Sequence, residues 1–172
     1  TTFYTVTSDK LDADMRIVEL SDLHLREYGE KKDELVERIR NLKPDIIAVA
    51  GDMNIDENPD YTVVLELMEQ LVEIAPVYYG PGNHEWAGIY GWHYSAMADE
   101  IAATGAHFLL QRYEDVEING NKLRIGGIFE WPREQLEWPN SQKVVDALDA
   151  QKQDTSNVYT ILICHCPEVF YT

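Results

Sequence analysis

Residues 45–52, DIIAVAGD, join a run of small and branched apolar side chains directly to a Gly-Asp pair. Such a run is typical of a β-strand that is buried on both faces, as in a parallel sheet with helices packed against it. The strand is expected over residues 45–50, so Asp52 stands just beyond its carboxyl end. This stretch therefore predicts an α/β fold that carries a carboxylate at the edge of its sheet.

Two further polar clusters lie one strand-plus-helix unit away from Asp52, one in each direction. Asp22 precedes it by 30 residues and Asn83 follows it by 31, which is the usual length of such a unit. Strands are expected just before the two clusters, over residues 15–20 and 77–79, and the first of them is apolar enough for burial on both faces. Parallel strands joined by crossover helices point the same way, so residues that follow successive strands gather along one rim of the sheet. The three clusters are therefore expected to meet.

The segments between and after these strands show helical and strand patterns in turn. Apolar side chains at the spacing of one helical face predict helices over residues 31–42 and 61–74, each followed by a proline. Later in the chain the pattern changes to that of a second, antiparallel element, with an Asn-Gly hairpin signal at residues 119–120. Its expected elements are helices over 94–103 and 142–151 and strands over 107–110, 113–118, 122–128 and 158–164.

Length and composition indicate a single domain over residues 1–172, with a substantial core and no apolar run long enough to span a bilayer. The chain carries 31 acidic and 14 basic residues, which argues against a protein that binds nucleic acid through a basic surface. The resulting net charge of −17 would also repel a phosphorylated ligand. Bound divalent cations would reverse the field locally, because an ion is usually the largest charge in its site.

Cys164 and Cys166 are the only cysteines of the sequence and stand on either side of His165. Residues two apart on a strand lack the usual geometry of a disulfide, so two free thiols are expected. A Cys-His-Cys zinc site is disfavoured because His165 would point to the opposite face of the strand. Free thiols favour the cytoplasm. The first residue is Thr1 rather than Met, which leaves an exported or membrane-anchored parent protein as an alternative.

The polar clusters offer the ligands of a metal centre. Asp22 and His24 lie two apart, which on an extended segment puts both side chains on one side and lets them reach the same ion. Asp52, from the neighbouring strand, can bridge that ion and a second one. Asn83 offers an amide oxygen and His165 an imidazole to the second ion. Mixed ligands of this kind suit Mn²⁺, Fe or Zn²⁺.

Two cations about 3.5–4 Å apart with a shared carboxylate polarise a phosphoryl oxygen and generate hydroxide near neutral pH. His84, next to Asn83, then remains available for proton transfer to a leaving group or for stabilising charge on the phosphoryl oxygens. Each motif alone is also consistent with surface residues or with an ordinary turn. Their order along the chain, one motif at each expected strand end, favours the metal centre.

The runs that carry these residues are MRIVELSDLH at 15–24, AGDM at 50–53, GNHE at 82–85 and ICHCPE at 163–168. Together they resemble the calcineurin-like metallophosphoesterase superfamily, and within it the bacterial phosphodiesterases with an SDLHL motif. The resemblance implies an α/β/β/α sandwich of four layers built on two mixed sheets. It also implies a phosphoesterase, a phosphodiesterase or a phosphatase, that hydrolyses a small phosphorylated substrate by hydroxide attack at two divalent metal ions.

The same resemblance implies a role for each candidate residue. Asp22 and His24 are implied to bind one metal, and Asp52 to bridge both metals. The second metal is implied to be held by Asn83 and His165. His84 is implied to be the catalytic residue that assists the leaving group.

One part of the family pattern is missing. Members of the superfamily close the site with a Gly-His-x-His motif that supplies one more imidazole to each metal, and the sequence up to Thr172 contains no such motif. The fold is therefore expected to be incomplete at its C-terminus. Either a second polypeptide or a partner copy completes it, or the chain is a catalytically inactive fragment or scaffold that binds one metal or a phosphate.

Overall fold

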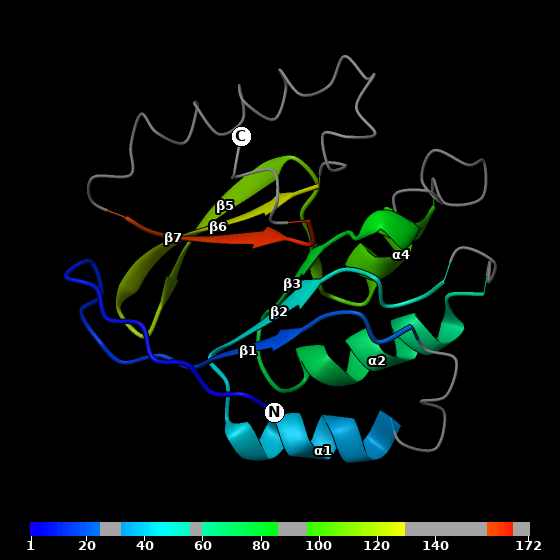
Figure 1. Ribbon diagram of the computed structural model, residues 1–172, viewed down its shortest axis with the longest axis horizontal. Helices are drawn as coiled ribbons and strands as arrows, with labels where there is room; N and C mark the ends of the chain where they lie inside the picture. Colours follow the sequence, from blue (N-terminus) through cyan, green and yellow to red (C-terminus); the bar gives the residue numbers. More distant parts are fainter. Residues whose placement is uncertain (25–31, 56–59, 86–95, 130–157, 167–172) are drawn as a thin grey trace.

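Four parallel strands form the first sheet of the computed structural model, which describes residues 1–24, 32–55, 60–85, 96–129 and 158–166 (Figure 1). Across this sheet the strands are β1 (Ile17–Leu20), β2 (Ile46–Ala50), β3 (Val77–Gly80) and β4 (His107–Phe108). The helices between successive strands are α1 (Lys32–Leu42), α2 (Thr62–Val72) and α4 (Met97–Ala103). The second sheet has the order β5 (Arg112–Ile118), β6 (Asn121–Ile128) and β7 (Tyr159–Cys164).

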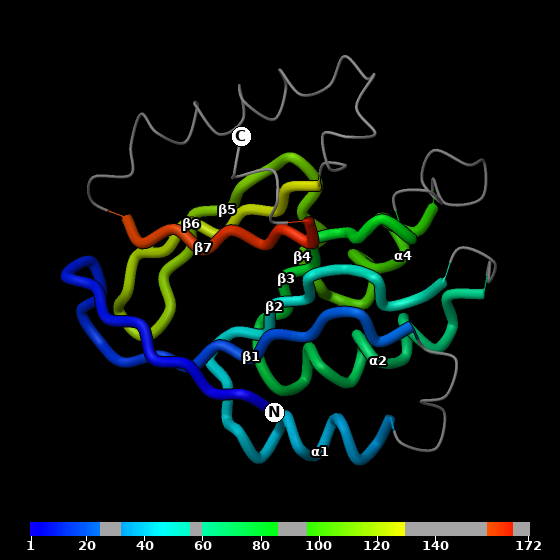
Figure 2. Tube along the Cα trace, in the orientation of Figure 1, coloured from blue at the N-terminus to red at the C-terminus, as the bar shows by residue number. Residues whose placement is uncertain are grey.

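Both faces of the first sheet are buried at its two central strands, β2 and β3, and the alternation along β2 shows which layer covers each face. Ile47 and Val49 belong to the core between the sheet and the helices, whereas Ile46 and Ala48 belong to the core between the two sheets. Figure 2 shows the same order of layers, with the helices, the first sheet and the second sheet stacked in turn. Burial of both faces of one central strand thus stabilises three stacked layers.

The first sheet is parallel throughout its described strands, so the expectation of two mixed sheets is wrong for this sheet. The reason is that a helix connects each strand to the next and returns the chain in the same direction. The second sheet is mixed, as expected, because β5 pairs antiparallel and β7 parallel with β6. The helix expected over residues 142–151 lies outside the described residues.

The helices that cross from β1 to β2 and from β2 to β3 begin and end close to the predicted positions. Each has 11 residues, against predictions over residues 31–42 and 61–74. At the start of α2, the Asp60 carboxylate accepts the N–H of Thr62 at 2.9 Å. No helix of the described ranges is both long and apolar enough to cross a membrane.

β1 is more exposed than the sequence predicts. It lies at the edge of the described sheet and pairs there with β2 alone, so one side of the strand has no neighbour among the described strands. Ile17 is 39% exposed as a result. The apolar pattern of residues 15–20 therefore indicates a strand correctly but is wrong about burial on both faces.

The Asn-Gly hairpin at residues 119–120 is confirmed. Asn119 and Gly120 both have left-handed backbone conformations, with φ of 52° and 81°, and they join β5 to β6. The next residue, Asn121, is fully buried, and its side-chain oxygen accepts the N–H groups of Asp12 (2.7 Å) and Ala13 (3.0 Å). The hairpin thereby fixes the N-terminal segment against the second sheet.

Strands from both sheets end at the same side of the molecule. β1, β2 and β7 point in one direction in Figure 1, and β3 runs parallel to β2. His165, which directly follows β7, lies 2.7 Å from the carbonyl oxygen of Ala50 at the end of β2. The loops after four strands therefore come together, which is the arrangement that open α/β sheets use to build ligand sites.

Candidate metal centre

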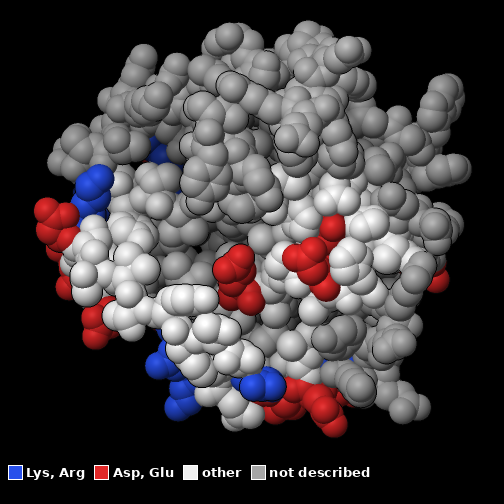
Figure 3. All heavy atoms as spheres, in the orientation of Figure 1, with Lys and Arg blue, Asp and Glu red and all other residues white. Residues whose placement is uncertain are grey.

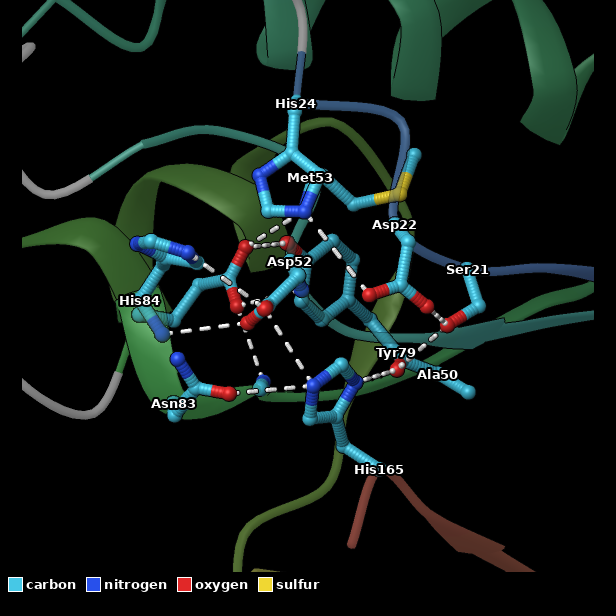
Figure 4. Close-up of polar contacts among 12 residues, drawn as sticks. Ser21, Asp22, His24, Ala50, Asp52, Met53, Tyr79, Asn83, His84 and His165 are labelled. Atoms are coloured by element: carbon cyan, nitrogen blue, oxygen red, sulfur yellow. Dashed lines mark hydrogen bonds and ion pairs between the residues drawn. The ribbon is translucent and has the colours of Figure 1, made fainter.

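The loops that follow β1, β2, β3 and β7 bring the residues singled out from the sequence to one place (Figure 4). These residues are Asp22, His24, Asp52, Asn83, His84 and His165. The first two loops are joined through their backbones, because Asp22 N–H donates to the carbonyl of Gly51 and His24 N–H to that of Asp52, both at 3.1 Å. The polar clusters of the sequence thus meet at the rim of the sheet, while their roles as metal ligands stay predictions.

Asp52 lies at the middle of the cluster, with its side chain 4% exposed. Its Oδ2 is 3.2 Å from Nε2 of His165 and 3.6 Å from Nε2 of His84, and its Oδ1 accepts the backbone N–H of His84 at 3.0 Å. Burial alone would raise the pKa of Asp52, but the hydrogen bonds and charges of His165 and His84 lower it below its ordinary value. Asp52 is therefore a carboxylate that stays ionised and faces several ligand atoms at once.

A hydrogen bond at Nδ1 of the His165 ring determines whether its other nitrogen, Nε2, carries a proton or a lone pair. Nδ1 lies 2.7 Å from the carbonyl oxygen of Ala50, which can only accept, so Nδ1 carries the proton of the neutral ring. The lone pair of Nε2 then points at Asp52 Oδ2 (3.2 Å) and Asn83 Oδ1 (3.1 Å). Metal-binding histidines commonly have their second nitrogen held by a backbone carbonyl in this way.

Three acceptor atoms therefore converge on one point, and such a point needs a proton or a cation. Without a cation, a proton on His165 Nε2 can take this place; when the ring is neutral, the amide of Asn83 can instead turn over so that its NH₂ group donates to His165 Nε2 (3.1 Å) and Asp52 Oδ2 (3.3 Å). A divalent cation would instead favour the oxygen of Asn83, because carboxylate, amide oxygen and imidazole nitrogen are all cation ligands. These three ligand atoms therefore fit a metal ion.

Two groups of potential ligands occur among the described residues, each with its ligand atoms within 4.8 Å of one another, and Asp52 belongs to both. One group combines Asp52 with Asp22 and His165, and the other combines it with His24 and His84. His24 and His84 pack edge to face with ring centroids 4.9 Å apart. Asp22 and His24 have the most exposed side chains of these residues, at 57% and 38%. A carboxylate shared by two ligand groups is an arrangement that could serve a pair of cations.

The extended segment expected at Asp22 and His24 is wrong. Both residues have left-handed backbone conformations, with φ of 55° and 42°, so the chain turns sharply after β1 instead of continuing as a strand. Their side chains still meet, with His24 Nε2 3.7 Å from Asp22 Oδ1. Asp52 is also left-handed, with φ of 53°. Conformations of this kind are strained for residues other than glycine and cluster at functional sites.

The zinc site considered for the cysteines finds no support in the described residues. Cys164 and Cys166 form no disulfide, as expected, and neither belongs to a group of potential metal ligands there. His165 turns its ring toward Asp52, 3.2 Å away. The imidazole is thus associated with the carboxylates rather than with the thiols that flank it.

Sequence reasoning missed the residue that joins the loops under the site. Glu85 is fully buried, and its carboxylate accepts the backbone N–H groups of Asp52, Met53 and Gly82. The sequence held one indication of this role, because Glu85 directly follows His84 in the Gly-Asn-His-Glu run. A carboxylate in a buried turn beside a site residue needs several hydrogen-bond donors. Ser21 was also missed; its hydroxyl contacts the Asp22 carboxylate and the Ala50 carbonyl.

Close backbone packing between the loops after β2 and β3 leads to a prediction for Gly82→Ala. A Cβ at Gly82 would lie 2.1 Å from Oδ1 of Asp52 and 2.5 Å from its backbone nitrogen, where backbone cannot give way. We expect the substitution to lower the free energy of unfolding by about 1–3 kcal/mol, the usual cost of overpacking. It should also weaken metal binding, since Asp52 must move. Urea unfolding and Mn²⁺ titration measure the two effects, and an unchanged midpoint would contradict the packing described.

The metal-free protein should show an unusual histidine titration. The hydrogen bond to Asp52, with smaller effects from the Ala50 carbonyl and nearby carboxylates, raises the pKa of His165 from 6.5 to about 9, although burial opposes the shift. A raised pKa stabilises the fold fully below pH 6.5, and this contribution is lost as the pH rises through 9. Proton NMR of the His165 ring in chelator should give a midpoint near pH 9. A midpoint near 6.5 would mean that the contact with Asp52 is absent in solution.

Comparison with known proteins identifies relatives of the chain. A model of the calcineurin-like phosphoesterase family matches residues 15–167. A metallophosphoesterase of Caenorhabditis elegans is 29% identical over 153 residues, which make up 86% of this chain and 30% of that protein. An uncharacterised metallophosphoesterase of Helicobacter pylori is 31% identical over 81 residues, 45% of this chain and 22% of that protein. The chain spans less than a third of the length of these curated relatives.

A solved structure shares the fold. The crystal structure of a phosphopantetheinyl hydrolase from Mycobacterium tuberculosis superposes with a TM-score of 0.59, covering 87% of this chain and 67% of that chain. Sequence identity between the two is 16%, so the likeness concerns the fold. The parallel sheet and the mixed sheet described above are therefore an arrangement found in a known hydrolase.

Proposed function

The chain belongs to the calcineurin-like phosphoesterase family, and we propose that it hydrolyses a phosphate ester at two divalent cations held around Asp52. The observation that carries this proposal is the position of Asp52 in both groups of ligand atoms. A single buried carboxylate between two ligand sets is what a two-cation site needs. The SDLHL motif supports a place among the bacterial phosphodiesterases of the family, with a small phosphorylated molecule as substrate.

The proposed ligands divide between the two cations. Asp22 and His24 would hold one cation, and Asn83 and His165 the other, with Asp52 shared. The short distances within each pair support this division, since His24 Nε2 lies 3.7 Å from Asp22 Oδ1 and His165 Nε2 lies 3.1 Å from Asn83 Oδ1. It differs from the two groups of ligand atoms described above, which place Asp22 with His165 and His24 with His84. Mn²⁺, Fe and Zn²⁺ all suit such mixed ligands.

Divalent cations in such a site supply activation of water near neutral pH and polarisation of a phosphoryl oxygen. The protein's own groups then orient the reactants. The Ala50 carbonyl holds the His165 ring so that Nε2 faces the site, and the backbone N–H of His84 holds the Asp52 carboxylate. The His84 ring is 26% exposed and lies 3.6 Å from Asp52. From there it can donate a proton to the leaving oxygen as a general acid.

The charge of the protein makes cations necessary for an anionic substrate. The net charge is −17, and the middle of the face in Figure 3 carries acidic side chains. A phosphate group approaching an apo site built on Asp22 and Asp52 would be repelled. Cations bound there would reverse the local field and make the same rim attractive to a phosphorylated ligand.

Hydrolysis of an aryl phosphodiester with added Mn²⁺ tests the proposal. We expect activity with Mn²⁺, loss of that activity after treatment with chelator, and recovery when Mn²⁺ is restored. Calorimetry should find two Mn²⁺ ions per chain. A chain that binds one ion and hydrolyses neither phosphodiesters nor phosphomonoesters would instead be the inactive scaffold of the same fold.

A further inference from the structure

Glu85 has no part in the proposed chemistry, yet it is fully buried directly beneath the site. Its Oε2 accepts the backbone N–H groups of Asp52 (2.7 Å) and Gly82 (2.8 Å). Its Oε1 accepts the backbone N–H of Met53 (2.8 Å) and the hydroxyl of Tyr79 (2.9 Å). Both carboxylate oxygens are therefore used, and each is held by two donors.

The donors come from separate parts of the chain. Asp52 and Met53 belong to the loop after β2, Gly82 belongs to the loop after β3, and Tyr79 is a residue of β3 itself. A buried carboxylate is costly unless it is fully hydrogen-bonded, and bonds to a charged acceptor are stronger than neutral ones. The two loops can satisfy Glu85 only when they lie together in this register. The carboxylate thus acts as a clamp between them.

The clamp acts on the residues of the metal site through the backbone of Asp52. Its N–H is held by Glu85, while its carbonyl accepts the N–H of His24 at 3.1 Å and its Oδ1 accepts the N–H of His84 at 3.0 Å. The strained left-handed conformation of Asp52 needs such support from its surroundings. A shift at Asp52 would therefore move parts of three loops.

We propose that Glu85 is a positioning residue that sets the distance between the loops after β2 and β3, so that Asp52 and Asn83 can bind the same cation. The inference rests on the proposed function for the identity of the cation site. The clamp itself rests on the four hydrogen bonds alone. Glu85 touches neither substrate nor cation in this assignment, and its effect on both passes through backbone amides.

Glutamine at position 85 keeps the shape of the side chain but cannot replace its hydrogen bonds. The amide of Glu85→Gln has one oxygen acceptor, and its NH₂ group would face at least one backbone N–H in either orientation, because each carboxylate oxygen meets a backbone N–H. Two donors facing each other force the loops apart. Glu85→Asp keeps both acceptor oxygens but withdraws them by one methylene, so its effect should be intermediate.

The control is a buried clamp in another part of the molecule. Asn121 is fully buried and binds the backbone N–H groups of Asp12 and Ala13. Asn121 is the first residue of β6. Ile128, at the other end of that strand, pairs with Cys164 of β7, which directly precedes the site residue His165. Asn121→Ala should therefore destabilise the protein without disturbing the metal site.

Two measurements on the wild type and these variants test the proposal. Hydrogen exchange in chelator should show protected amides at residues 52, 53 and 82 in the wild type and faster exchange there in Glu85→Gln, with no such change in Asn121→Ala. Mn²⁺ affinity, measured by calorimetry, should fall about 10- to 100-fold in Glu85→Gln, as for other supporting residues of metal sites. Glu85→Asp should fall between the wild type and Glu85→Gln.

The outcomes separate the clamp from the proposed function. Unchanged amide exchange in Glu85→Gln would overturn the clamp, whether or not the protein binds metal. Equal loss of Mn²⁺ affinity in Glu85→Gln and Asn121→Ala would overturn positioning in favour of general destabilisation. A wild type that binds no Mn²⁺ would overturn the proposed function and the positioning of a cation, while the exchange data would still decide the clamp. If Glu85→Gln does not fold, the same comparisons apply to Glu85→Asp.

Discussion

Asp52→Asn should weaken Mn²⁺ binding by more than about 100-fold and abolish hydrolysis of a phosphodiester. Loss of a supporting residue costs about 10- to 100-fold in metal affinity, and the loss of a ligand shared by two groups should exceed that range. Asparagine keeps the size of the side chain and an oxygen that can accept the backbone N–H of His84. The variant therefore removes the charge while leaving the loop contacts in place.

The matched control for Asp52→Asn is Asp115→Asn. Asp115 lies on β5, where its carboxylate accepts two hydrogen bonds from Arg124 at 2.7 and 2.8 Å, and its side chain is 62% exposed. Such a surface pair contributes little to stability, so the control should bind Mn²⁺ and hydrolyse the substrate like the wild type. Calorimetry and steady-state rates compare the two variants. Binding of two Mn²⁺ ions by Asp52→Asn at wild-type affinity would refute the shared role of this carboxylate.

The fold could be predicted from sequence where burial leaves a periodic trace. Residues 46–50 are apolar at every position because β2 has a covered face on each side, and the helices on one of those faces repeat apolar side chains at helical spacing. The direction of strands leaves no such trace. A mixed first sheet was implied by family resemblance, and the helical connections make its described strands parallel instead.

The candidate site could be predicted as a set of residues but not as a geometry. Strand ends mark where polar side chains gather, which is why Asp22, Asp52, Asn83 and His165 were found without coordinates. The left-handed turns at Asp22 and Asp52 could not be found in this way, because neither residue is a glycine and hydrophobic periodicity says nothing about a loop. Glu85 was missed for a related reason, since its partners are backbone groups that every residue carries.

His84→Ala should lower kcat by about 10²- to 10⁴-fold, the range for loss of a general acid, and should leave the binding of two Mn²⁺ ions nearly unchanged. The backbone N–H of residue 84 still holds Oδ1 of Asp52 in the variant, so the substitution isolates the role of the ring. His107→Ala is the matched control. His107 lies on β4, where its ring pairs with Glu114 at 2.6 Å, and it belongs to neither group of ligand atoms, so its loss should alter neither quantity.

The His84 ring also belongs to a group of ligand atoms with His24 and Asp52, so the same variant decides between two roles. If the ring were a metal ligand, Mn²⁺ affinity would fall together with the rate. If it donates a proton to the leaving oxygen, the affinity for Mn²⁺ stays unchanged, and the loss of rate depends on the leaving group of the ester. An aryl ester with a good leaving group needs little protonation, whereas an alkyl ester needs more, so the alkyl ester should lose more activity. Equal losses for both esters would refute the role of general acid.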